Sequence, residues 1–256
     1  MTETQQFRWA LELKADRLDM DDALACFGSC TDPTIRNVGN EASPCFALTS
    51  PQMEGLTTHQ EVEEVAKRLL GIVNGVLFAL EADHQPLSFD GILERSSTGW
   101  NKHIAAVMHG RSRARAGGMA LVHGKPSPQH TRPPPALRWT AAAQNDQTVS
   151  DVFQYLSGKP DWFNFYKAFE LMRDDIEQGC GKRGQTNMGW PSKKNLKHFT
   201  LSAQVFRHAP PWEDGYTPDR AMPLPEASSF IRSLTNTWLK WRFPIVLLTV
   251  HVWSSH

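Results

Sequence analysis

Hydrophobic and polar positions follow two different periods in the first half of the chain. Four apolar residues alternate with polar or small residues near the start: Phe7, Trp9, Leu11 and Leu13. This period of two predicts a half-buried β-strand. From Thr58 to about Leu80, apolar residues recur every three or four positions, which predicts one amphipathic α-helix. Thr58 and Glu61 have the spacing of a capping box, so we expect the helix to begin there.

Short strands are expected after this helix. The segments 87–95, 102–109 and 119–124 are apolar runs separated by turns that contain Gly or Ser. A strand, a helix and then a series of short strands favour an antiparallel sheet with the long helix on one face. The sequence therefore predicts an N-terminal α+β domain over residues 1–124.

Prolines mark the expected boundary between two domains. Residues 125–135 read KPSPQHTRPPP, and this density of proline excludes a continuous helix or a central strand. We therefore predict a proline-rich linker over residues 125–147.

Four amphipathic helices are predicted after the linker, over residues 148–242. The first ends near Gly158, the second is capped by Asp161, the third is capped by Ser192 and the fourth begins near Pro225. Apolar residues of the second helix alternate at spacings of three and four: Trp162, Phe165, Phe169, Met172 and Ile176. In the third helix, Leu196, Phe199, Ala203 and Phe206 are expected to face inward. Such seams with short connections predict a C-terminal antiparallel four-helix bundle, so the fold class is α+β.

The last segment, residues 243–256, is an apolar tail that we expect to add a strand or to form a dimer contact. Its apolar run, 244–253, is much shorter than the roughly 20 residues that cross a bilayer. The first residues lack the basic and apolar regions of an export signal. The sequence thus predicts a cytoplasmic protein without a membrane partner.

Charge is distributed unevenly, although the net charge is zero. The chain has 16 acidic and 6 basic residues up to Glu94, whereas residues 95–145 contain 8 basic residues, four histidines and no acid. Arg111, Arg113 and Arg115 occupy alternate positions, so an extended segment would project them to one side. This cluster indicates nucleic-acid binding through phosphates, or else a solvated loop that offsets the acidic first third of the chain.

Metal and cofactor sites are not predicted. Cys26 and Cys30 are spaced like half of a loose zinc knuckle, but no second pair completes four ligands. Phosphate-binding, dinucleotide-binding and serine-hydrolase motifs are absent from the sequence. We therefore assign no metal ion and no cofactor.

Arg207 and His208 form the first candidate site, at the end of the third bundle helix. A histidine titrates near neutral pH and an arginine holds phosphate in a fixed fork, so together they could cleave RNA. The alternative is structural, because cationic side chains near a helix C-terminus interact favourably with the helix dipole.

A second basic group lies at the opposite end of that helix. It contains Lys182, Arg183, Lys193 and Lys194, next to a helix N-terminus that could receive an anion. We expect either nucleic-acid binding or a solvated loop here.

The C-terminal half resembles uncharacterised bacterial proteins with HEPN-like helical bundles. The resemblance rests on DWFNFYKAFELMRDDI, a turn with a lone Trp, a helix that ends in RH and a last helix that opens PLPEAS, and it covers Asp151 to Trp241. It implies an RNA-cleaving toxin, an antiphage effector or a non-catalytic accessory module, often a homodimer, with RNA or an antidote protein as partner.

The family pattern also has an Arg followed, after four to six residues, by the His. Leu201, Ser202 and Ala203 occupy those places before His208. We therefore predict an RNA-binding or RNA-cleaving protein of a bacterial defence or toxin-like system, with the non-catalytic version favoured. The alternative is a non-enzymatic module that docks a partner protein or senses a nucleotide.

Overall fold

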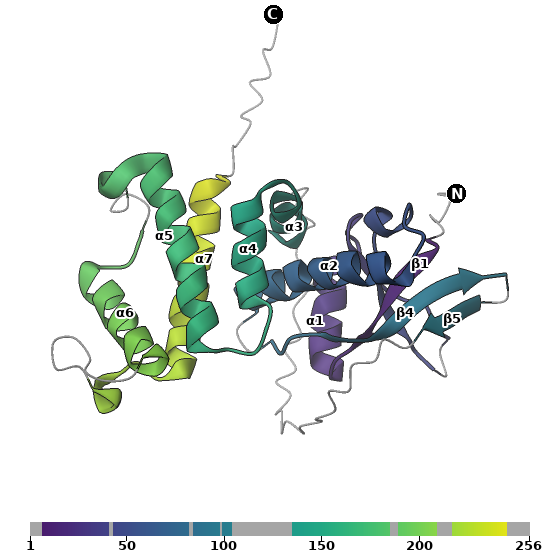
Figure 1. The fold of residues 1–256 in the computed structure, drawn as a ribbon, viewed down its shortest axis with the longest axis horizontal. Helices are drawn as coiled ribbons and strands as arrows, with labels where there is room; N and C mark the ends of the chain where they lie inside the picture. Colours follow the sequence, from purple (N-terminus) through teal and green to yellow (C-terminus); the bar gives the residue numbers. More distant parts are fainter. Residues whose placement is uncertain are drawn as a thin grey trace, which may run out of the picture.

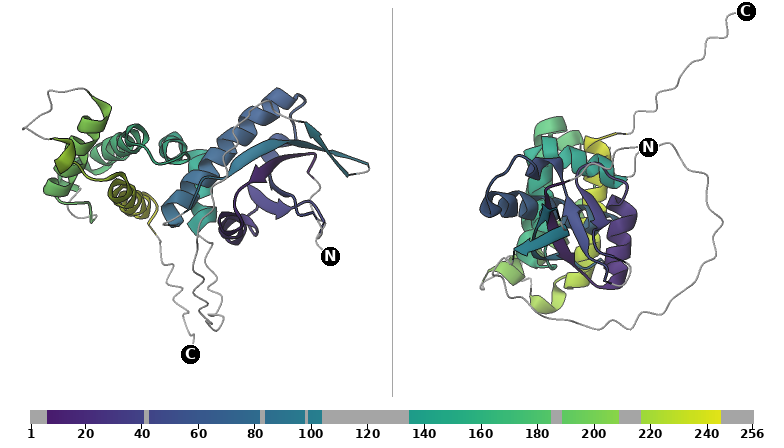
Figure 2. Two further views of the ribbon diagram at one scale, coloured as in Figure 1. Left: turned by 90° about the horizontal axis from the view of Figure 1, so that it is seen from below. Right: turned by 90° about the vertical axis from the view of Figure 1, so that its right-hand side faces the viewer.

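The protein has an α+β fold, with an antiparallel sheet in the first half and helices in the second (Figure 1). The structure is a computed structural model, and it describes residues 7–40, 43–81, 84–97, 99–103, 135–184, 189–208 and 217–244, without the side chains of 180–184 and 218. In Figures 1 and 2 the β4–β5 hairpin lies at one end of the long axis and α6 lies at the other.

The sheet has five strands in the order β2-β3-β1-β4-β5, and all neighbouring pairs are antiparallel. The strands are β1 (Trp9–Lys14), β2 (Thr34–Asn37), β3 (Phe46–Thr49), β4 (Ser88–Ser96) and β5 (Gly99–His103). In β1, Trp9, Leu11 and Leu13 are buried on the inner face, because side chains alternate between the two faces of a strand. The register pairs Trp9 with Glu94 and Ile92 with His103, so Glu94 and His103 also lie on the inner face.

Two helices pack on this inner face, α1 (Arg17–Phe27) and α2 (His59–Leu80). Asp16 caps α1 by accepting a hydrogen bond from the backbone N–H of Asp19 (3.0 Å). The capping box predicted for α2 is present: Thr58 Oγ1 accepts from the Glu61 backbone N–H (3.3 Å), and Glu61 accepts from the Thr58 backbone N–H (3.1 Å). The predicted long helix and the predicted strand β1 are therefore confirmed.

The strands predicted after the long helix are found only in part. The run 87–95 forms β4, but β5 starts at Gly99, and the segment 119–124 lies outside the described residues. The sequence analysis did not predict α1, β2 or β3. α1 is only weakly amphipathic, and β2 and β3 have four residues each, which is too short for a period of two to be recognised.

Five helices make up the second half: α3 (Pro135–Asn145), α4 (Gln147–Leu156), α5 (Trp162–Gly184), α6 (Lys193–Arg207) and α7 (Leu224–Arg242). Short 3-10 helices occupy Pro51–Met53 and Pro218–Arg220. α3 corrects the predicted linker at 125–147, because proline is tolerated in the first turn of a helix and the alanine-rich residues that follow bury Ala136 and Trp139. None of the described helices combines the length and the hydropathy needed to cross a membrane.

The apolar stripes predicted for the later helices are largely buried. All five stripe residues of α5 are at most 8 % exposed. Of the residues that we expect to face inward from the last helix, Ala227, Ile231, Leu234 and Trp238 of α7 are fully buried and Trp241 is partly buried. Asp161 and Ser192 cap α5 and α6 as expected, through the backbone N–H groups of Asn164 and Asn195. Phe206 is the exception: it was expected to face inward, but it is 50 % exposed because α6 ends beside it.

α4 joins the two halves by packing closely on α2. A Cβ atom on Gly75 of α2 would lie 2.5 Å from the Cβ atom of Phe153, so the two helices approach almost backbone to backbone. The α2–α4 contact belongs to one hydrophobic cluster that extends from Trp9 in β1 to Leu239 in α7. The described residues of the two halves thus share a core.

Candidate functional site

α6 lies at one end of the molecule (Figure 1) and carries several basic side chains. Lys193, Lys194 and Lys197 are exposed, Arg207 ends the helix, and none of its 15 residues is acidic. Lysines that emerge from one face of a helix create a positive potential that attracts phosphates.

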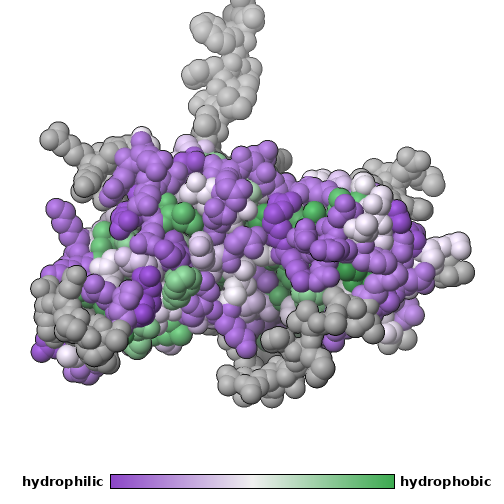
Figure 3. Space-filling model, viewed as in Figure 1, coloured by the Kyte–Doolittle hydropathy of each residue, from purple (hydrophilic) through white to green (hydrophobic). Residues whose placement is uncertain are grey.

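Two large aromatic side chains are exposed where α5 packs against α6. Phe163 is 53 % exposed and Phe206 is 50 % exposed, although large apolar side chains are usually buried. Phe206 stacks on Trp162, with the ring centroids 5.2 Å apart and the planes 12° from parallel. We call Phe163, Phe206 and the basic residues of α6 the α5–α6 surface. On the side drawn in Figure 3, hydrophobic residues form small patches in a largely hydrophilic surface.

Arg207 is held by aromatic rings. Its guanidinium carbon lies 4.1 Å from the centre of the Tyr166 ring and 5.7 Å from that of Phe163, which are cation–π distances. Its Nε atom is buried and has no hydrogen-bond partner. His208 follows as the C-cap residue, with its backbone N–H donating to the Gln204 carbonyl (2.9 Å) and its side chain exposed. The Arg207 side chain is thus packed against aromatic rings, and the His208 side chain is exposed to solvent.

The positions that carry the Arg of the HEPN pattern are occupied by core residues. Leu201, Ser202 and Ala203 are at most 8 % exposed. The Ser202 hydroxyl donates to the His198 carbonyl (2.7 Å) and accepts from the backbone N–H of Met222 (2.8 Å). Ser202 thus links α6 to the segment before α7, and all three positions hold buried residues in place of an arginine.

The structure describes only some of the other basic residues that the sequence analysis singled out. Lys182 and Arg183 lie in the last turns of α5, but only their backbone is described. Arg111, Arg113 and Arg115 lie outside the described residues, as does the tail from residue 245 onward.

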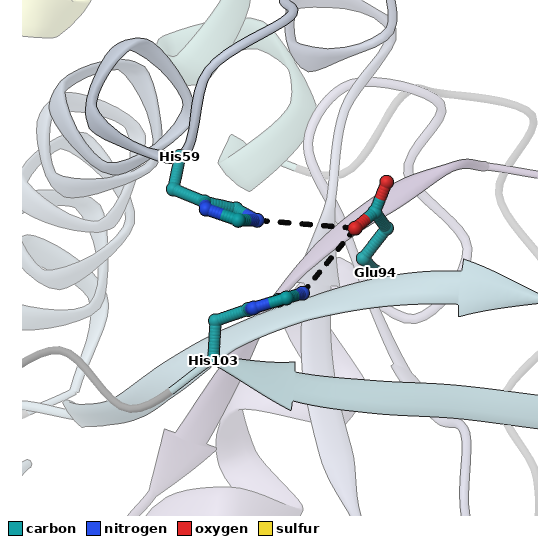
Figure 4. A group of neighbouring side chains, drawn as sticks. All are labelled: His59, Glu94 and His103. Carbon is teal, nitrogen blue, oxygen red and sulfur yellow. Dashed lines mark ion pairs between the residues drawn. The ribbon is translucent and has the colours of Figure 1, made fainter.

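A group that the sequence analysis did not predict is formed by His59, Glu94 and His103 (Figure 4). His59 is the first residue of α2, Glu94 lies in β4 and His103 ends β5. The Nε2 atoms of His59 and His103 lie 3.8 and 3.3 Å from the same oxygen, Glu94 Oε2. The two imidazole rings are close to one another, with centroids 3.9 Å apart.

Residues around this trio hold the carboxylate in place. Arg8 donates to the other oxygen of Glu94, Oε1, from Nη2 (2.9 Å) and Nε (3.3 Å). These hydrogen bonds are the main reason why the pKa of Glu94 is below its usual value. The indole of Trp9 meets the His59 ring edge-on at 5.3 Å. Glu94 Oε2 is therefore the oxygen that remains directed at the histidines.

Sequence spacing could not reveal this group, because its members are 35 and 9 residues apart and lie in three separate elements. Cys26 and Cys30, which the sequence analysis considered, have an ordinary structural setting. The Cys30 thiol donates to the Cys26 carbonyl (3.3 Å), and burial raises the pKa of Cys26 to about 11.

Comparison of the chain with protein-family models, with curated proteins and with solved structures gives no match. The HEPN-like resemblance therefore stays a prediction.

Proposed function

We propose that this protein binds single-stranded RNA through the α5–α6 surface, as a HEPN-like module of a bacterial defence or toxin-like system. The observation that carries the proposal is the composition of α6, which has lysines or an arginine at four of its 15 positions and no acid. A protein surface with this charge attracts a polyanion and releases its counterions.

The exposed rings favour a single strand over a duplex. Unpaired bases can stack on aromatic side chains whatever their sequence, and each stack contributes about 1–3 kcal/mol. Phe163 and Phe206 are available for such stacking, and the lysines at the start of α6 are available for phosphates. A duplex would keep its bases inside and leave the rings unused.

Binding without cleavage is the version that we favour. The guanidinium of Arg207 stacks on Tyr166. The three positions at which the HEPN pattern could have its arginine hold Leu201, Ser202 and Ala203, which are buried. Metal-independent cleavage would need a cation near the scissile phosphate as well as a proton carrier such as His208.

Fluorescence anisotropy with a labelled single-stranded RNA tests the proposal. We expect the triple substitution Lys193→Ala, Lys194→Ala and Lys197→Ala to weaken binding and to lower the salt slope by about 0.7 for each lost phosphate contact. Phe206→Ala is expected to weaken binding by about 1–3 kcal/mol with little change in the slope. Leu18→Ala serves as the matched control, because Leu18 is also exposed (62 %) but lies on α1.

Three outcomes would count against this version. Absence of binding at low salt would contradict RNA binding altogether. Cleavage that is lost in His208→Ala would show an active ribonuclease instead. Binding of a protein or a free nucleotide to the same surface, with no affinity for RNA, would favour the alternative of a docking or sensing module.

A further inference from the structure

We infer that His59, Glu94 and His103 bind a divalent transition-metal ion, and that Zn²⁺ fits this set of ligands best. Two imidazoles and one carboxylate are among the ligand sets of zinc sites in which three protein ligands leave a position open. Among the residues that the structure describes, this trio is the group of His, Cys, Asp or Glu side chains close enough to share an ion.

The ligand atoms converge on one point. Both histidines direct Nε2 at Glu94 Oε2, and the three atoms all lie within 4.8 Å of one another. Around a tetrahedral zinc ion with bonds of about 2.0–2.1 Å, neighbouring ligand atoms are about 3.4 Å apart. The His103–Glu94 distance of 3.3 Å already has this value, and the His59–Glu94 distance of 3.8 Å needs only a small rotation of an exposed ring.

Hydrogen bonding within the trio is poorly directed. His103 Nε2 is buried, and its contact with Glu94 Oε2 at 3.3 Å has the distance of an ion pair but not the geometry of a well-directed hydrogen bond. Buried polar atoms are normally paired, so this nitrogen calls for a partner. An ion bound by both the ring and the carboxylate would provide one.

The surroundings resemble the outer shell of a metal site. Arg8 holds Oε1 of Glu94, so the carboxylate offers a single oxygen, Oε2, to the ion. The three ligands project from a helix and two paired strands, which keep their positions more accurately than loops do.

One side of the trio is open to solvent. The side chains of His59, His103 and Glu94 are 52, 37 and 26 % exposed. A zinc ion bound by three side chains in such a setting keeps a water molecule as its fourth ligand, and its charge lowers the pKa of that water. The arrangement thus fits a site that receives a further ligand, unlike a closed structural zinc site.

The test uses the full chain after removal of metal with a chelator. Zn²⁺ affinity is measured by competition with a chromophoric chelator, and Co²⁺ serves as a spectroscopic probe of coordination. We expect one bound ion per chain, with a visible Co²⁺ spectrum of four- or five-coordinate geometry. His59→Gln, Glu94→Gln and His103→Gln should each weaken binding at least tenfold, and Arg8→Ala should weaken it by about 10–100-fold.

His198→Gln is the matched control, since His198 lies on α6 in the other half of the molecule. Its affinity for Zn²⁺ should equal that of the unchanged chain. Two results would overturn the inference: no specific binding of either ion, or binding that persists when both His59 and His103 are replaced. Because the three ligands are partly exposed, their replacement should leave the circular dichroism spectrum unaltered.

Discussion

His84 is a buried histidine whose ring has no strong partner in the fold. Its side chain is 2 % exposed and neither ring nitrogen makes a hydrogen bond, although Nδ1 lies 3.3 Å from an oxygen of Asp19. Burial disfavours the charged ring and lowers the pKa of His84 to about 4, against the smaller opposing effect of the Asp16 carboxylate. The folded protein therefore holds His84 in its neutral form at pH 7.

This lowered pKa predicts a loss of stability in mild acid. Between pH 6.5 and about 4 the unfolded chain binds a proton at residue 84 that the folded chain does not, so the free energy of unfolding falls as the pH falls. We expect His84 to contribute a decrease of roughly 2 kcal/mol across this range. Denaturant titrations of the unchanged chain and of His84→Gln at several pH values measure it.

The difference between the two chains isolates His84 from the other titrating groups. A constant difference in stability from pH 7 to pH 4 would contradict the prediction. Such a result would mean that the folded protein takes up the proton on His84 as readily as the unfolded chain does.

Close contact between two helices governs stability at the scale of secondary structure. The side of α2 that faces α4 carries Gly75, and the space where its Cβ would lie is occupied by the Cβ, Cα and carbonyl oxygen of Phe153 at 2.5–2.6 Å. Backbone atoms cannot move away as the end of a long side chain can. Glycine at this position is therefore required by packing.

Replacing Gly75 with alanine should destabilise the fold by roughly 1–3 kcal/mol, in spite of the higher helix propensity of alanine. The expected effect has this sign because α2 and α4 must separate to admit a methyl group. Thermal unfolding followed by circular dichroism measures it. Gly158→Ala is the control, because a Cβ on Gly158 meets no atom within 4 Å, and its effect should stay within about 0.5 kcal/mol.

Elements with long, regular patterns were predictable from the sequence, and so were their caps. α2, α5 and α7 bury most of the apolar residues that were expected to face inward, and the capping box of Thr58 and Glu61 is present. α1, β2 and β3 were not predictable, because α1 is only weakly amphipathic and four-residue strands gain their stability from contacts that are distant in sequence. The proline-rich run hid α3, because proline excludes the interior of a helix but not its first turn.

The two candidate sites also differ in how far the sequence could predict them. Lys193 and Lys194 are neighbours in sequence, so their common place at the start of α6 followed from the predicted helix and its cap. The trio of His59, Glu94 and His103 depends on strand register and on where α2 begins relative to the sheet. Neither quantity is contained in the spacing of residues along the chain.

At the scale of the whole molecule, the sequence analysis expected two domains, 1–124 and 148–242, that could each bury a core. The described residues of both ranges contribute to one hydrophobic cluster, and polar contacts reinforce it. From α7, Arg232 Nε and Asn236 Nδ2 donate to the carbonyls of Phe78 (2.8 Å) and Ala79 (2.7 Å) at the end of α2. Side chains of the second half thus donate hydrogen bonds to backbone carbonyl groups of the first half.

The junction between α2 and α4 implies that cohesion of the two halves does not depend on the peptide chain between residues 103 and 135. Fragments 1–103 and 135–256, produced together as separate polypeptides, should associate. The complex should then unfold in a single cooperative transition. Size-exclusion chromatography and calorimetry of the mixture measure this. If each fragment melts cooperatively by itself and the two elute apart, the molecule consists of two independent folding units.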